Sequence, residues 1–133
     1  MKKLIFVLVT LLTLSCSKSD DKTSTSNDFN PPSWIQGTWG IRDNALNTTT
    51  KLFRFTNDDY IIIASPFEQS YKGLISQTRS TGGTASVTES ISPTNYSFTA
   101  NITTSTAISN SFTYISANSI KWNDQNATLI RLP

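Results

Sequence analysis

Apolar and polar side chains alternate with a period of two through most of residues 31–133, and this pattern constrains the fold more than any other feature of the 133-residue chain. Such alternation is typical of β-strands with one buried and one exposed face. Ser and Thr account for 39 residues and Ile for another 13, a composition that favours strands and turns over helices. The sequence therefore predicts an all-β domain with strands near residues 37–42, 50–56, 59–64, 70–78, 84–92, 95–101, 111–116, 119–123 and 127–132.

Turn residues separate these segments at intervals of about 8 to 12 residues. Gly82 and Gly83 can both adopt positive φ, which predicts a two-residue hairpin between the flanking strands. Pro93 has no amide hydrogen and interrupts the pattern again. Because the links are short, strands that are neighbours in sequence are expected to pair antiparallel. The predicted architecture is a small up-and-down antiparallel β-barrel of about eight strands, with a β-sandwich as the alternative.

The alternation also predicts which side chains face inward. Seven aromatic residues fall on the apolar faces of the expected strands: Phe53, Phe55, Tyr96, Phe98, Phe112, Tyr114 and Trp122. A barrel of this size either fills its interior with side chains or holds one small ligand. These residues are therefore candidates for lining a pocket, and filling the core is the alternative.

The N-terminus has the pattern of a secretory signal. Lys2 and Lys3 precede an uncharged apolar stretch at residues 4–14, which is too short to span a bilayer as a helix. With Cys16 directly after it, the segment resembles a lipoprotein signal of the Bacteroidetes type. The resemblance implies that residues 1–15 are removed and that Cys16 carries acyl chains such as palmitate, which would anchor the protein in the outer membrane.

Residues 16–30 are polar apart from Cys16 and Phe29, and they are expected to form a flexible linker. The start of this segment resembles the surface-export signal of Bacteroidetes lipoproteins, so exposure at the cell surface is expected, with retention on the periplasmic face as the alternative. Pro31 and Pro32 end the linker and leave residues 31–133 as the folded domain.

Charge and composition exclude several functions. The net charge of +2 comes from Lys2 and Lys3, and removal of residues 1–15 leaves nine basic and nine acidic side chains. Nucleic acid is therefore not an expected partner. The chain has no His, and Cys16 is its only Cys, so no nucleophilic or metal site is indicated and no cofactor is expected. The Asp58–Asp59 pair is interpreted as turn chemistry, with a weak calcium site as the alternative. An enzyme is not expected.

The segment Gly37–Thr38–Trp39 at the start of the domain resembles the Gly-x-Trp opening of lipocalins, and Arg131 on the last expected strand is similar to their late arginine. The resemblance implies that Arg131 stacks on Trp39 and covers one end of the barrel, through a cation-π contact. It also implies a protein that binds a small apolar or amphipathic ligand at the cell envelope. Two other functions remain open: an accessory subunit of an outer-membrane complex, and an inhibitor of a hydrolase. A cavity inside the barrel would favour ligand binding, and a filled core with exposed apolar residues would favour a protein partner.

Overall fold

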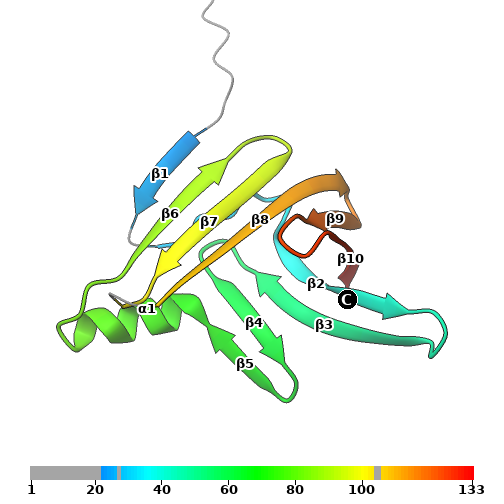
Figure 1. Cartoon of the computed structure of the whole chain (residues 1–133), viewed down its shortest axis with the longest axis horizontal. Coiled ribbons are helices and arrows are strands. Elements are labelled where there is room, and N and C mark those ends of the chain that lie inside the picture. Colours follow the sequence, from blue (N-terminus) through cyan, green and yellow to red (C-terminus); the bar gives the residue numbers. More distant parts are fainter. Residues whose placement is uncertain (1–21, 27, 104–105) are drawn as a thin grey trace, which may run out of the picture.

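The computed structural model describes residues 22–26, 28–103 and 106–133. These residues form one sheet of ten strands and a short helix (Figure 1). The strands are β1 (Lys22–Ser26), β2 (Gly37–Asp43), β3 (Thr48–Phe55), β4 (Tyr60–Ala64), β5 (Phe67–Ser70), β6 (Ser86–Ile91), β7 (Asn95–Asn101), β8 (Ala107–Ser116), β9 (Ser119–Trp122) and β10 (Ala127–Leu132), and the helix is α1 (Tyr71–Ser80). In the part of the chain that the structure describes, no helix combines the length and apolar character needed to cross a bilayer.

All strand pairs are antiparallel, and the sheet order is β1-β6-β7-β8-β9-β10-β2-β3-β4-β5. Consecutive strands are neighbours in the sheet except for two pairs: β1 pairs with β6 and not with β2, and β5 and β6, which α1 separates in sequence, are not paired. The last strand, β10, returns to pair with β2. The sheet curls into a half-barrel, with β1 and β5 as its edges (Figure 1). The predicted all-β, up-and-down, lipocalin-like architecture is confirmed.

The prediction of a strand at residues 70–78 is wrong, because this segment is α1. Ser70 caps the helix by accepting a hydrogen bond from the Gly73 amide at 2.9 Å. Tyr71, Leu74 and Ile75 follow at helical spacing and pack toward the core, with only Ile75 fully buried. The segment's apolar positions fit a helical stripe as well as an alternating strand.

The predicted hairpin at Gly82 and Gly83 is also wrong, because these residues end α1. Gly82 has φ +84 just after the C-cap residue Thr81 and donates its amide to the Arg79 carbonyl at 3.0 Å. The Gly83 amide donates to the Thr78 carbonyl at 2.9 Å. A positive φ was expected at this position, and Gly82 has one, but it ends a helix and does not form the turn of a β-hairpin.

The expected flexible linker at residues 16–30 needs correction over the residues that the structure describes. Residues 22–26 form β1, which extends the sheet by pairing with β6. Phe29 is 2% exposed and lies edge-on to Phe98, with ring centroids 5.2 Å apart. The polar composition of this segment predicted a linker, although the segment contains an edge strand, β1, and one core residue, Phe29.

Candidate functional site

The three residues of the lipocalin resemblance meet at one end of the sheet. The guanidinium carbon of Arg131 lies 4.4 Å from the ring centroid of Trp39, which has no solvent exposure. Arg131 faces Trp39 across the pairing of β10 with β2. The geometry that the resemblance implied for this pair is present.

Arg131 donates hydrogen bonds to three main-chain carbonyl groups. Its Nε donates to the carbonyl of Ala117 at 2.7 Å, its Nη2 donates to that of Trp34 at 2.9 Å, and its Nη1 donates to that of Gln36. A guanidinium is suited to this role because its donors form a rigid planar fork. Arg131 therefore connects β10 to the segment before β2 through main-chain hydrogen bonds.

Gly37 is required at this corner for two reasons. Its φ of +126 is a conformation that L-residues with side chains rarely adopt. A Cβ atom at this position would also collide with Nη1 of Arg131. Trp39 is fixed independently, since its indole Nε1 donates to the Ile35 carbonyl at 2.6 Å. These residues close one end of the fold, and their role is structural.

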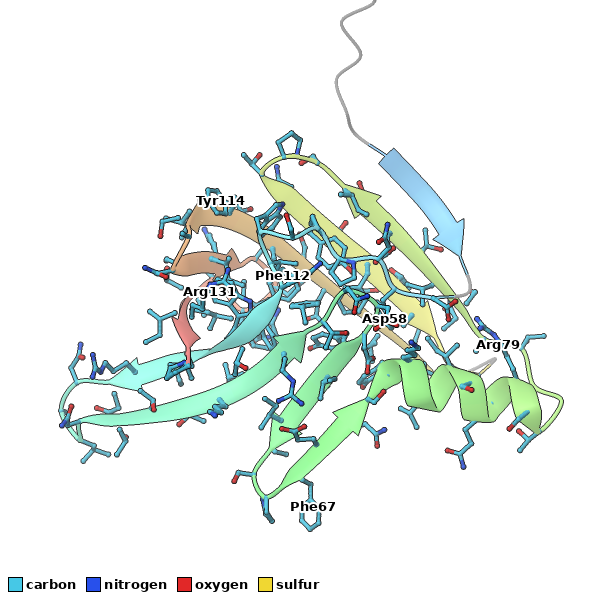
Figure 2. All side chains as sticks on the ribbon, turned by 180° about the vertical axis from the view of Figure 1, so that it is seen from behind. Asp58, Phe67, Arg79, Phe112, Tyr114 and Arg131 are labelled. Carbon is cyan, nitrogen blue, oxygen red and sulfur yellow. The ribbon has the colours of Figure 1, made fainter. Side chains whose placement is uncertain are left out.

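The inward aromatic residues fill the interior and do not line a pocket there. Five of the seven predicted pocket residues are at most 3% exposed: Phe53, Phe55, Tyr96, Phe98 and Phe112. Their rings contact one another, as in the Phe55–Phe112 pair with centroids 5.4 Å apart and the Phe53–Phe112 pair at 5.3 Å. Phe112 lies amid this cluster within the curled sheet (Figure 2). Rings from opposite sides of a small half-barrel meet at its centre, which leaves the space between them occupied.

The other two predicted pocket residues also take part in packing. Trp122 lies edge-on to Phe53, with centroids 5.5 Å apart, and donates its indole Nε1 to Oδ1 of Asn110 at 2.9 Å. Tyr114 lies edge-on to Trp34 with centroids 5.7 Å apart. Both side chains are half-buried and extend the aromatic cluster toward the surface.

Glu89 is a buried carboxylate that the sequence analysis did not single out. It is 1% exposed, its two oxygens share the main-chain N–H of Asn30 at 2.9 and 3.0 Å, and it accepts a hydrogen bond from the Tyr96 hydroxyl at 2.6 Å. Burial, together with the charge of Glu89, raises the pKa of Tyr96 far above its usual range. The carboxylate holds the segment after β1 against the core. Its position on the apolar face of β6, between Val87 and Ile91, was the signal that could have revealed it.

The Asp58–Asp59 pair serves the start of α1. Asp59 accepts hydrogen bonds from the Ser70 hydroxyl at 2.6 Å and the Lys72 amide at 2.8 Å, and Asp58 forms an ion pair with Lys72. The side-chain hydrogen bond between Lys72 and Asp58 lowers the pKa of Asp58 and raises that of Lys72. Among the described residues, no group of three His, Cys, Asp or Glu side chains could hold a metal ion.

The most open part of the molecule lies between two hairpins. Residues 41–51, which form the outer half of the β2–β3 hairpin, are exposed on both faces. This ribbon, called here the β2–β3 arm, carries Ile41 at 44% exposure and Leu46 at 71%. The tip of the β4–β5 hairpin carries Phe67, which is 76% exposed and projects away from the body of the protein (Figure 2). Exposed apolar residues concentrated in this way are typical of a contact surface.

A groove of about 630 Å³ separates the two hairpins. Residues 49–52 line one side and residues 63–68 line the other, and this space is called here the hairpin groove. The two hairpins diverge in Figure 1, with their tips pointing apart. Other hollows along the described residues are smaller and have fewer apolar neighbours: one of about 210 Å³ over the Ser- and Thr-rich outer face of β6, β7 and β8, one of about 300 Å³ beside residues 84–86, and one of about 360 Å³ beside Arg42 and residues 130–133. The hairpin groove is therefore the better candidate for binding.

No protein-family model, curated protein or solved structure matches the chain. The functional argument accordingly rests on the geometry of the fold and of the hairpin groove.

Proposed function

We propose that this protein is a lipid-anchored outer-membrane lipoprotein that acts as an accessory subunit and binds a protein partner through the hairpin groove. The observation that carries the proposal is the contrast between a filled interior and an exposed apolar groove. Among the described residues the aromatic core leaves no cavity for a small ligand, whereas Phe67 is largely exposed at the groove and Leu46 is largely exposed at the tip of the β2–β3 arm that borders it. A protein surface supplies the matching apolar area that such residues need.

The lipid anchor in this proposal rests on the leader and on Cys16, which lie outside the described residues. Replacement of Cys16 by Ser removes the thiol that would be acylated. We expect the Cys16→Ser variant to lose metabolic palmitate labelling and to leave the membrane fraction. Retention of the variant in membranes after a high-salt wash would contradict the anchor. This test is independent of what the folded domain binds.

The folding of β1 adds an orientation to the anchored protein. Lys22, the first residue of β1, is six residues after Cys16, so an extended chain places it at most about 20 Å from the lipid. Lys22 pairs with Ile91 at the end of β6, beside the β6–β7 turn. In Figure 1 this end of the sheet and the two hairpin tips lie on opposite sides. The anchored protein would therefore present its hairpin groove away from the membrane.

Binding of a small apolar ligand is the second candidate and is supported by the lipocalin resemblance of Gly37, Trp39 and Arg131. Enzymatic activity is not part of the proposal. The chain has no His, and the buried carboxylates Asp59 and Glu89 already accept hydrogen bonds within the fold.

Site-specific photo-crosslinking distinguishes the two candidates. A benzophenone amino acid at position 67 or 46 is expected to crosslink one protein of defined mass in intact cells, because Phe67 lines the hairpin groove and Leu46 lies at the tip of the β2–β3 arm that borders it. The matched control is position 115, because Ile115 is also exposed, at 52%, but does not line the groove. Native mass spectrometry of protein extracted from its own membrane provides the second measurement. A stoichiometric small ligand without a protein adduct would contradict the proposal.

A further inference from the structure

The hairpin groove contains an unpaired strand edge. β3 pairs with β2 along its whole length, from Phe55 opposite Gly37 to Thr48 opposite Asp43. Its pairing with β4 covers only residues 53–55 and ends where Phe53 lies opposite Ile62. Residues 48–52 of β3, called here the open edge, therefore have a strand on one side and the groove on the other.

The open edge has main-chain groups that point into the groove. A Cβ placed on Gly40 would collide with the carbonyl oxygen of Thr50, so this carbonyl is directed toward β2. Successive residues of an antiparallel strand direct their main-chain groups to opposite sides. Thr49 consequently directs its N–H and C=O groups away from β2 and toward the groove, and so does the N–H of Lys51, because it points opposite to the Thr50 carbonyl in the same planar peptide. An extended peptide is the ligand that matches such a row of donors and acceptors.

The charge on the β2–β3 arm indicates the kind of peptide. Arg42 lies opposite Thr49, and Lys51 is two residues further along β3, so the three side chains share one face of the ribbon. Neither cation has an ion pair with any described residue. Two copies of this edge would place these cations near one another, which disfavours self-association. An acidic side chain on an added strand would instead lie beside them.

Apolar side chains at the groove indicate the second feature of the peptide. Leu52 and Ile63 are half-buried where β3 and β4 diverge, and Phe67 is exposed at the far side. In an added strand, alternate residues face the same side of the sheet. A peptide with apolar residues at alternate positions would therefore cover these side chains along one face while its acidic residue meets the cations on the other.

We propose that the partner contributes an extended segment that adds as a strand to the open edge of β3, with an acidic residue beside Lys51. This inference rests on the proposed function and specifies the chemistry by which the partner is recognised. The main chain of Thr49 and Lys51 provides the hydrogen bonds, and the side chains around the groove select the sequence.

Proline substitution at Thr49 tests the inference, because it removes an amide that faces the groove and leaves the amides facing β2 in place. The matched control is Thr49→Ala, which loses the same side chain and keeps the amide. The probe is a library of random linear peptides, selected for binding to the full folded chain. Selected peptides are expected to alternate in polarity and to carry Asp or Glu. Their affinity, measured by fluorescence anisotropy, should fall at least about tenfold for Thr49→Pro and little for Thr49→Ala.

Two further measurements make the test specific. Hydrogen exchange should show that a selected peptide protects the amides of Thr49 and Lys51, and Lys51→Glu should weaken the binding of acidic peptides. Equal affinity for the Pro and Ala variants, or a selection without peptides that depend on the Thr49 amide, would overturn strand addition. If crosslinking at position 67 still captures one protein in that case, the proposed function survives and only this binding mode is wrong. Loss of the crosslink would instead remove the proposed function itself.

Discussion

The two halves of the β2–β3 hairpin have opposite roles although they belong to the same pair of strands. In the inner half, Trp39 and Phe53 pair directly and are almost completely buried. The register then shifts between Trp39 and Gly40, and every residue from 41 to 51 is exposed. An isolated two-stranded ribbon is marginally stable in water. The inner half therefore contributes to the stability of the fold. The outer half contributes little to stability, and we infer that its role is binding.

The β-bulge at this boundary separates the two halves. It leaves Leu52 as the extra residue of β3 at the point where pairing with β4 also stops. Bulges bend a strand and increase its twist, which turns the outer ribbon away from its neighbour. The same irregularity therefore ends the core and opens the hairpin groove.

The largest expected effect is on the inner half. Trp39→Ala removes a fully buried ring, its cation-π contact and an indole hydrogen bond, so the free energy of unfolding should fall by about 3 to 5 kcal/mol. Chemical denaturation checks this value. Leu46→Ala, in the outer half of the same hairpin, is the control and should change the free energy by less than about 0.5 kcal/mol. Similar losses for the two variants would remove the distinction between the halves.

Arg131→Ala should have a smaller effect, a loss of about 2 kcal/mol, because the guanidinium both stacks on Trp39 and donates to three carbonyl groups. Arg131→Lys retains the charge but cannot reproduce the planar fork, so it should recover only part of the loss. Since Arg131 and Trp39 are in contact, a double-mutant cycle should give a coupling above about 0.5 kcal/mol. Additive losses would contradict the stacked corner.

The sequence was informative where packing follows local pattern. Alternation identified most strands and seven of the aromatic residues that take part in the packed cluster, because the side-chain period of a strand is set by its backbone. It did not identify Phe29 or Tyr60, which are 2% exposed and pack against Phe98. The corner of Gly37, Trp39 and Arg131 was predictable only through the family resemblance. Nothing local in the sequence indicates that Arg131, 94 residues after Gly37, returns beside it.

Other features depended on tertiary contacts that alternation does not encode. The helix at residues 71–80 forms because Ser70 and Asp59 provide its N-terminal hydrogen bonds, and Asp59 lies in the turn before β4, twelve residues before the helix begins. The polar segment at residues 22–26 is ordered by pairing with β6. The hairpin groove forms because β3 pairs with β2 as far as Thr48 but with β4 only as far as Phe53. This difference depends on how three strands pair with one another and not on the sequence of any one of them.

The smallest effect on stability is expected at Phe67, where the comparison between a structural and a binding region becomes sharpest. Phe67→Ala removes a ring that is 76% exposed, so the free energy of unfolding should change by no more than about 0.5 kcal/mol. The yield of the crosslink formed from position 46 should nevertheless fall severalfold, because Phe67 lines the hairpin groove to which the partner is proposed to bind.

Ile115→Ala is the matched control for this last prediction. Ile115 is also an exposed apolar residue, at 52%, but it follows Tyr114, which Figure 2 shows on the side of the molecule opposite Phe67. This variant should leave both stability and crosslink yield unchanged. An equal fall in yield for both variants would mean that the partner recognises exposed apolar residues in general and not the hairpin groove. A loss of stability for Phe67→Ala alone would instead assign the β4–β5 tip to the structural part of the molecule.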